Sequence, residues 1–323
     1  MAVFVYKGDT TNLAPKNVTN VEFDHFVLEV GNNAFKGCKY LETINIPTTV
    51  HTIGESAFDK CNSLTKVNLP ISVNKIENWA FNECRCLQQI TIPPSLKSMG
   101  NGAFINCKSI ETIDLSQSSL HTSGDYTFQG CTSLESIMLP LSLHTIDKGT
   151  FYDCKSLKSI DLPSSVHTIK TRAFKGCSSL THIAIPKNLE TIEVATFAEC
   201  TSLANIDIPS SIQIIEGRAF ENCSSLTYID IPPSVKTIGV RSFSGCINLH
   251  TIFMSKNLKY HPSALPEDTM VIRSSWHEIS QFILLRELLK SGRATMQENS
   301  SVLHKIFKCP SDDIFRYVMT FFA

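Results

Sequence analysis

Charged residues are scarce in this sequence. Asp, Glu, Lys and Arg make up 18% of the 323 residues, and the formal net charge is -1 at pH 7. Because neither sign of charge dominates, bulk electrostatics gives no reason to expect binding to nucleic acid or to an anionic membrane. Hydrophobic residues make up 42% of the chain, which is enough for a sizeable core and argues against disorder.

Long apolar runs are also missing. No stretch approaches the roughly 18 consecutive apolar residues that a transmembrane helix needs. The run Ala2 to Tyr6 is too short for the core of a signal peptide, and the final residues MTFFA carry no prenylation or retrieval signal. We therefore expect no membrane span and a cytoplasmic or nuclear location, with the cell surface as the alternative.

The short motifs that mark many enzymes are absent from the sequence. It contains no GxGxxG, no P-loop, no GxSxG and no HExxH. It also contains no CxxC pair and no Cys/His cluster with zinc-binding spacing. We expect no catalytic activity, no cofactor and no metal site.

What the sequence does contain is a repeat. The stretches AFKGC, AFDKC, AFNEC and AFINC begin at residues 34, 57, 80 and 103, and their Phe recurs every 23 residues with one step of 24. The repeated phenylalanines are Phe35, Phe58, Phe81, Phe104, Phe128, Phe151, Phe174, Phe197, Phe220 and Phe243. A fixed period of this length indicates a solenoid, in which each coil buries its apolar side against the next. We number the repeats 1 to 10 from these residues and expect the ten rings to stack in an internal column.

Each repeat predicts two short extended segments. The first ends in Ile-x-Ile-Pro, as in Ile229 to Pro232, and alternates apolar with polar residues at the strand period of two. Proline ends that strand because it lacks the backbone donor. The second has the form Val-x-x-Ile, as in Val235 to Ile238. One face of each ladder should point into the coil and the other to solvent.

Ten of the twelve cysteines occupy one repeat position, three residues after the Phe. Three interpretations exist. Disulfides between neighbouring coils need a Cβ separation near 3.8 Å, which stacked equivalent positions do not offer. Metal binding lacks the right spacing. The interpretation we favour is a small apolar side chain that fills the turn beside Phe.

Repeat 4 departs from the pattern. It gains one residue in the Gln117–Ser119 turn, has Ser116 where Pro is usual, and has Ser123 where Ile is usual. We interpret the insertion as a local bulge in the stack. The alternative is a recognition feature.

The unit I-x-x-I-x-x-x-A-F-x-x-C-x-x-L-x-x-I-x-I-P resembles the BspA-like leucine-rich repeat over about residues 18–262. The resemblance implies a right-handed solenoid with ladders of short parallel strands. Members of that family are mostly described as adhesion or protein-binding modules. This chain departs from the surface-exposed members because it shows no export signal or anchor.

Repeat arrays need caps, because the outer coils would otherwise expose apolar faces and strand edges. We expect an N-terminal cap with a degenerate half repeat at residues 1–30, the repeats at 31–262 and a small α-helical cap at 263–323. The cap helices should cover Trp276–Lys290, Val302–Phe307 and a segment from about Ser311. Its last segment loosely resembles the opening of an F-box, which makes an F-box-like adaptor a minor alternative.

The solvent-facing columns are the candidate binding surface. The middle residues of the Ile-x-Ile strands, with neighbouring Tyr228, supply carboxylates and possible apolar anchors. The candidate residues are Asp114, Met138, Asp161, Asp207, Tyr228, Asp230 and Phe253. A second column, in the Val-x-x-Ile segment, contains His51, His121, His144 and His167, which we interpret as a solvated polar row. A long polar surface suits a protein better than a small molecule. We expect a monomeric, non-catalytic scaffold that binds another protein, with a surface adhesin or carbohydrate-binding protein as the alternative.

Overall fold

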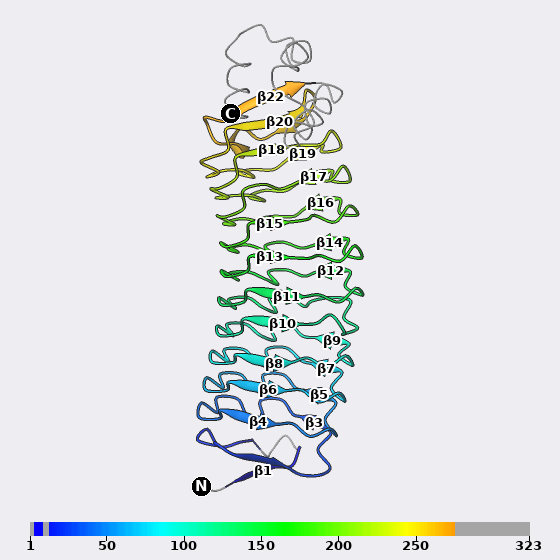
Figure 1. Cartoon of the computed structure of the whole chain (residues 1–323), viewed down its shortest axis with the longest axis vertical. Coiled ribbons are helices and arrows are strands. Elements are labelled where there is room, and N and C mark those ends of the chain that lie inside the picture. The colour runs from blue at the N-terminus through cyan, green and yellow to red at the C-terminus, as the bar shows by residue number, and fades with distance from the viewer. Residues whose placement is uncertain (1–2, 9–12, 275–323) are drawn as a thin grey trace, which may run out of the picture.

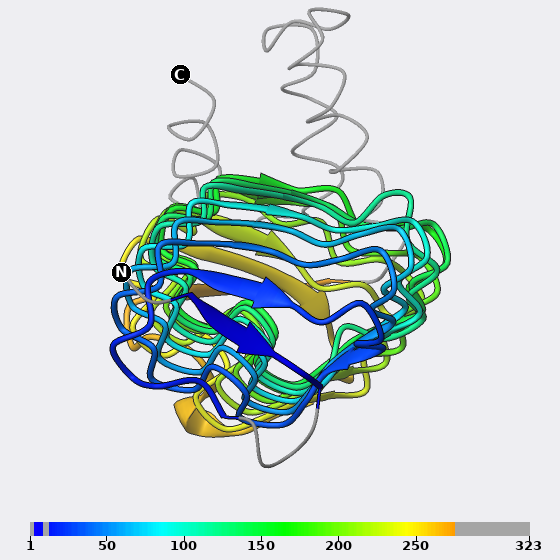
Figure 2. The ribbon, with the colours of Figure 1, turned by 90° about the horizontal axis from the view of Figure 1, so that it is seen from below.

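The computed structural model describes residues 3–8 and 13–274. It shows a long stack of similar coils, with the N-terminus at one end (Figure 1). Viewed along the stack, the coils nearly superpose on one outline (Figure 2). Most coils contribute a strand to each of two parallel ladders, as the alternating Ile-x-Ile and Val-x-x-Ile segments predict; repeat 8 has no strand in the first ladder and repeat 4 has none in the second.

The first ladder is built from the Ile-x-Ile segments, whose two Ile side chains point into the coil, as Ile44 and Ile46 do. Its strands are β4 (Thr43–Asn45), β6 (Lys66–Asn68), β8 (Gln89–Thr91), β10 (Thr112–Asp114), β11 (Ser136–Met138), β13 (Ser159–Ile160), β15 (His182–Ile183), β18 (Tyr228–Asp230), β20 (Thr251–Ser255) and β22 (Met270–Ser274). All its pairings are parallel and in register between equivalent repeat positions up to β20, for example Ile44 with Val67. Pro follows the strand in most repeats and ends it.

The second ladder is built from the Val-x-x-Ile segments. Its strands are β3 (Glu29–Val30), β5 (Thr52–Ile53), β7 (Lys75–Ile76), β9 (Ser98–Met99), β12 (Thr145–Ile146), β14 (Thr168–Ile169), β16 (Thr191–Ile192), β17 (Ile214–Ile215), β19 (Thr237–Ile238) and β21 (Lys259–Tyr260). The pairing is interrupted between β14 and β16 and also at repeat 4, where no strand forms and only one isolated bridge joins Thr122 to Thr145. The unusual sequence of repeat 4 therefore coincides with a break in the second ladder.

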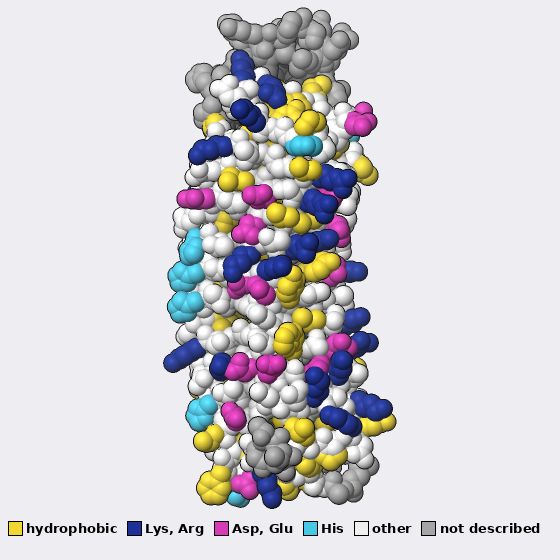
Figure 3. Space-filling model, turned by 180° about the vertical axis from the view of Figure 1, so that it is seen from behind, with side chains coloured by type: hydrophobic (Ala, Val, Ile, Leu, Met, Phe, Trp, Pro, Cys, Tyr) yellow, Lys and Arg dark blue, Asp and Glu magenta, His cyan; other side chains and the backbone are white. Residues whose placement is uncertain are grey.

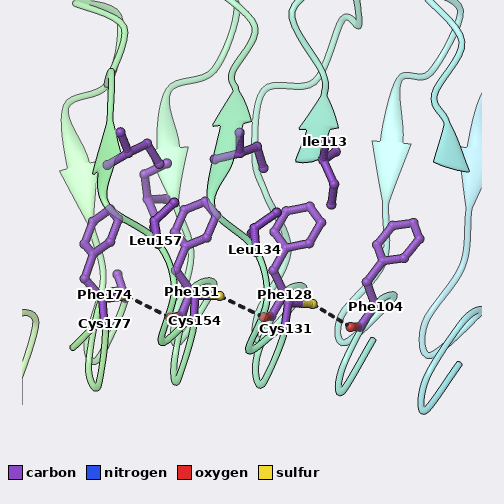
Figure 4. Packing of buried hydrophobic residues seen from close by; sticks show 14 of the residues in the cluster. Phe104, Ile113, Phe128, Cys131, Leu134, Phe151, Cys154, Leu157, Phe174 and Cys177 are labelled. Atoms are coloured by element: carbon purple, nitrogen blue, oxygen red, sulfur yellow. Dashed lines mark hydrogen bonds between the residues drawn. The ribbon is translucent and has the colours of Figure 1, made fainter. Parts of the chain in front are cut away.

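The ten phenylalanines form one buried column. Every ring is at most 1% exposed. Neighbouring centroids lie between 5.1 and 5.7 Å apart, and the interplanar angles lie between 2° and 15°. Such offset stacking is a favourable arrangement for aromatic rings. The prediction of an internal aromatic column is confirmed (Figure 4).

The cysteines lie beside the rings, and each has a polar contact that the sequence did not indicate. From Cys61 to Cys246, the nine thiols of repeats 2 to 10 donate to the carbonyl oxygen of Phe in the preceding coil, at 3.0 to 3.2 Å. Cys154, for example, donates to Phe128 (Figure 4). All ten repeat cysteines are buried and free. The thiol therefore fills the turn and also fastens one coil to the next.

The turn that carries Phe has two residues with left-handed backbone in every repeat. They lie two positions before and two positions after the Phe, as Trp79 (φ 54°) and Glu83 (φ 55°) do around Phe81. In this turn, the backbone N–H groups of Trp79, Phe81 and Glu83 donate to carbonyl oxygens of the next coil. The bond from Phe81 N to Ala103 O is 2.8 Å long. This geometry reverses the chain tightly enough to keep each ring inside the stack.

The ends of the described chain add further coils. β1 (Phe4–Tyr6) pairs in parallel with β2 (Val21–Phe23), so the extra N-terminal strand expected from AVFVY is present. After residue 262 the chain does not turn into a helical cap at once. A short 3-10 helix, η1 (Pro262–Ala264), leads to β22, which pairs in parallel with β20 and extends the first ladder. The helices expected at Trp276–Lys290, Val302–Phe307 and beyond Ser311, and the F-box-like segment, lie outside the described residues.

Candidate protein-binding face

The outer surface of the first ladder is a long polar face. Asp114 and Met138 lie opposite each other in β10 and β11, and Met138 is 54% exposed. Asp161 and Asp207 occupy equivalent positions and are also exposed, although neither lies in a strand: Asp161 directly follows β13, and repeat 8 has no strand at Asp207. The structure therefore brings four of the candidate residues into one exposed column over repeats 4 to 8.

The candidate face ends earlier than we expected. Tyr228 and Asp230 in β18 are only partly exposed. Phe253, expected as an exposed apolar anchor, is buried, with 4% of its surface exposed. The reason is that β20 is buried on both of its faces. Burying a phenyl ring away from water is strongly favourable. The prediction that Phe253 is an exposed anchor is therefore wrong.

Acidic side chains dominate the open part of this face. Besides Asp114, Asp161 and Asp207, the adjoining column contributes exposed Glu111 and Glu135. Glu135 pairs with Lys158 at 2.8 Å, but both side chains are more than half exposed, so this pair adds little to stability. The face is suited to a partner that presents basic and polar groups.

The histidine column lies along the second ladder. Three neighbours stack: the His121 and His144 rings are 5.4 Å apart and 6° from parallel, and the His144 and His167 rings are 5.7 Å apart with a tilt of 60°. Histidines gather along one edge in Figure 3. The Nδ1 atom of His121 lies 3.0 Å from the carbonyl oxygen of Ser119, which requires a proton on Nδ1. Across the described residues, no group of three or more His, Cys, Asp or Glu side chains is arranged to hold a metal ion.

The interior thiols are poor candidates for chemistry. Burial raises the pKa of Cys38 to about 11, and that of Cys61 and Cys131 to about 12. A nucleophilic cysteine needs the opposite, a thiolate at neutral pH and access to substrate. The repeated cysteines therefore contribute to packing and to hydrogen bonding between coils.

Some features of the surface were not predicted. The hydroxyls of Ser211 and Ser234 are buried without a hydrogen-bond partner, although equivalent serines in other repeats are bonded. The available signal was the turn after Pro186, where Asn188 stands at the position that is Ser or Thr in the other repeats with this proline. Repeats 7 to 9 also border hollows at this point of the surface.

The fold and its repeated turn define a leucine-rich repeat solenoid. The family model of the BspA type leucine rich repeat region matches residues 12–119, 51–181 and 167–274, so the chain belongs to the BspA-type leucine-rich repeat family. No curated protein matches the chain.

Solved structures with this repeat include three bacterial proteins. A leucine-rich repeat protein from Bacteroides ovatus is 26% identical, with 84% of this chain and 92% of that chain covered and a TM-score of 0.41. A leucine rich cell surface protein from Faecalibacterium prausnitzii is 27% identical, with coverage of 82% and 81% and a TM-score of 0.41. The pneumococcal vaccine antigen PcpA is 21% identical, with coverage of 89% and 80% and a TM-score of 0.59, which shows the shared fold.

The description of the family that matches names a repeat region and no catalytic activity. Within residues 3–8 and 13–274, no helix has the length and hydropathy to cross a bilayer.

Proposed function

We propose that this protein is a non-catalytic scaffold that binds another protein through the outer face of its first ladder. The observation that supports the proposal is the exposed column of Asp114, Met138, Asp161 and Asp207, held on a rigid stack of coils. A row of fixed side chains loses little conformational entropy on binding, which favours affinity.

The chemistry of the face specifies the partner. Three carboxylates and the neighbouring Glu111 favour a surface rich in Lys or Arg, which would associate faster at low salt. Met138 is the apolar group best placed to act as an anchor, because it is flexible and half exposed between the carboxylates. The proposed partner is a single protein bound by a monomer.

Affinity capture from a lysate of the source cells, followed by mass spectrometry, tests this face. The variant is Asp161→Arg with Asp207→Arg, and the control is Lys97→Glu with Lys236→Glu in the second-ladder column. All four side chains are exposed, so circular dichroism should show an intact fold for both. The proposal expects a partner that is retained by the wild type and the control and lost by the Arg variant. Identical partners for all three proteins would reject the assigned face.

The cellular location of the protein distinguishes the proposed scaffold from a surface adhesin. We propose that the protein lies in the cytoplasm. The free thiols do not decide the question, because buried thiols resist oxidation in either compartment. Labelling of intact cells with an antibody should detect no protein before permeabilisation. Detection on unpermeabilised cells would favour the adhesin.

A further inference from the structure

Another surface runs along the Phe turns, outside the two ladders. The residue two positions before the Phe differs between coils, and in repeats 3 to 6 an aromatic residue alternates with glycine. These four residues are Trp79, Gly102, Tyr126 and Gly149. The Trp79 side chain is 43% exposed, and Tyr126 is partly exposed. Repeats 3 and 5 therefore each present an aromatic ring to solvent.

Each ring lies against the glycine of the next coil. A Cβ atom at Gly102 would come within 2.7 Å of both Trp79 Cδ1 and Ile105 Cδ1. A Cβ atom at Gly149 would collide with the ring of Tyr126. Because glycine has no side chain, the ring can pack on the backbone while part of it stays in contact with water.

The apolar group around each glycine recurs after two coils. Ile105 follows Gly102 by three positions, and Tyr152 follows Gly149 in the same way. Both side chains are partly exposed. We call the two groups together the aromatic surface. Its members are Trp79, Gly102 and Ile105 in the first group, and Tyr126, Gly149 and Tyr152 in the second.

The fold does not require aromatic residues at this position. All ten repeats hold it in the left-handed region, and repeats 8, 9 and 10 have Ala195, Arg218 and Arg241 there. Trp79 has φ 54° and Tyr126 has φ 57°, a backbone conformation that is unfavourable for a bulky side chain. Strained backbone of this kind is concentrated at functional sites.

The separation of the two groups favours one ligand conformation. In the same coils, the ring of Phe104 lies 5.2 Å from that of Phe81 and 5.7 Å from that of Phe128, so two coils span about 11 Å. A polyproline II helix presents every third residue on one side, at intervals of about 9.3 Å. Same-side groups of an extended strand recur about every 6.8 Å. The polyproline II repeat is therefore the closer match, and broad aromatic rings can accommodate the remaining difference.

Basic side chains lie beside the second group. Arg172 occupies the same repeat position two coils beyond Tyr126, is exposed, and has no ion-pair partner within residues 3–8 and 13–274. The Nζ atom of Lys148 is 5.6 Å from the centre of the Tyr126 ring, and that of Lys175 is 5.5 Å from the centre of the Tyr152 ring. A ligand with an acidic residue three positions beyond its second proline would meet Arg172.

We propose that the aromatic surface binds a proline-rich peptide in the polyproline II conformation, with the spacing Pro-x-x-Pro-x-x-Asp or Glu. The first proline packs on Trp79, the second packs on Tyr126, and the carboxylate pairs with Arg172. Such a peptide is largely ordered before it binds, so aromatic side chains can hold it at a low cost in entropy. The surface does not include the first ladder, so this proposal is independent of the scaffold function proposed above.

Fluorescence anisotropy with labelled synthetic peptides tests the proposal. The peptide EAPPAPPAE presents the spacing in either chain direction, and EAGSAGSAE is the control without proline. The wild type should bind EAPPAPPAE with a Kd below about 1 mM and should bind the control about tenfold more weakly or worse.

The variants Trp79→Gly and Tyr126→Gly carry the residue that the next repeat has at the same position, so both should fold, which circular dichroism checks. Each should bind EAPPAPPAE about tenfold more weakly than the wild type, or worse, because an aromatic anchor is lost. Arg218→Gly is the matched control at the equivalent position of repeat 9, and it should bind as the wild type does.

Reversal of charge at Arg172 tests the acidic position of the ligand. The wild type should prefer EAPPAPPAE to KAPPAPPAK, and Arg172→Glu should reverse this preference. Equal affinity of the wild type for both peptides would overturn the assignment of Arg172.

Three results would overturn the proposal as a whole: no binding of EAPPAPPAE at millimolar concentration, equal binding of EAGSAGSAE, or unchanged affinity in both aromatic variants. Cellotetraose that binds where the peptide does not, and is lost in Trp79→Gly, would assign the surface to a carbohydrate instead. The first-ladder variant Asp161→Arg/Asp207→Arg should bind the peptide normally, so failure of the scaffold proposal would leave this result unchanged.

Discussion

At the scale of single residues, the phenylalanine of each repeat separates the inside of the molecule from its surface. Phe151 is fully buried between Phe128 and Phe174, whereas Met138 in a neighbouring coil is half exposed. Side chains of similar volume therefore have very different energetic roles, set by where the coil places them.

Truncating these two side chains should give very different results. Phe151→Ala leaves a cavity in the middle of the column and should reduce the free energy of unfolding by about 3–5 kcal/mol. Met138→Ala removes an exposed side chain and should change it by about 0.5 kcal/mol or less. Urea unfolding followed by circular dichroism gives both values. Equal effects of the two substitutions would contradict the aromatic column.

The left-handed turn residues provide a second test at this scale. Lys60 has φ 62° and is exposed, and the equivalent residue of the preceding repeat is Gly37 with φ 72°. A residue with a Cβ is strained there, so Lys60→Gly should raise the Tm, with a gain of about 0.5–1 kcal/mol. Lys66→Gly, in strand β6, is the control and should destabilise. A loss of stability in Lys60→Gly would show that the turn does not impose the left-handed backbone.

At the scale of elements, repeat 4 shows how a polar cluster can replace part of a ladder. Ser123 occupies the column held by Ile in most repeats, but its Oγ accepts from Asp147 N at 2.9 Å and lies 2.8 Å from Thr150 Oγ1. Asp147 in turn accepts from Gly124 N and pairs with Lys170 at 2.7 Å. The break in the second ladder is therefore filled by a bonded network and not by a void.

This network predicts that Ile, the usual residue at this repeat position, would lower stability if it replaced Ser123. Ser123→Ile would leave Asp147 N without its partner in a buried site and should cost about 1–3 kcal/mol. Met99→Ile, at the equivalent position of repeat 3, should be nearly neutral because it conserves volume and polarity. Chemical denaturation of both variants measures the difference. A gain of stability in Ser123→Ile would mean that repeat 4 tolerates a regular ladder.

At the scale of the whole molecule, the repeated cysteines make stability depend on pH. Folding raises the pKa of Cys61 and Cys131 from 9.0 to about 12, mainly through burial. Above pH 9 the unfolded chain releases these protons while the folded chain retains them, so stability falls as pH rises. The contribution is present below pH 9 and is lost between pH 9 and about 12, at about 1.4 kcal/mol per pH unit for each thiol.

Unfolding by urea at pH 8 and pH 10 tests this dependence. The midpoint should fall steeply, and the decrease should be smaller in Cys131→Ala/Cys154→Ala, measured relative to that variant's own stability at pH 8. Cys86 is exposed, so Cys86→Ser is the control and should behave as the wild type. Midpoints that do not change between pH 8 and pH 10 would contradict a buried thiol ladder.

Much of this architecture could be predicted because the same pattern of apolar and polar residues recurs ten times. The period, the two strands per coil and the Phe column follow directly from the spacing of Phe, Ile and Pro. The left-handed position after Phe did have a sequence signal, because seven of the ten repeats have Gly, Asn or Asp there. The position before Phe was harder to find, because Trp79, Tyr126 and Arg172 have no turn preference and are held there by neighbouring coils. Burial of Phe253 was missed because alternation predicts which side of a strand faces outward but not what covers that side.

Coupling between neighbours also determines how the candidate surfaces behave. Each coil contacts mainly the coils beside it, so the exposed column is as rigid as the stack beneath it. The backbone N–H of Phe in each repeat donates to the next coil, from Phe35 N to Ala57 O through to Phe243 N to Ala264 O, at 2.7 to 2.9 Å.

Hydrogen exchange at these ten amides tests the continuous stack most directly. Measured by mass spectrometry with peptides that resolve each Phe, all ten amides should exchange slowly, and the protection should continue without a gap from Phe35 to Phe243. Rapid exchange at these amides, or protection confined to separate blocks of the chain, would contradict a single array of coils with one shared core.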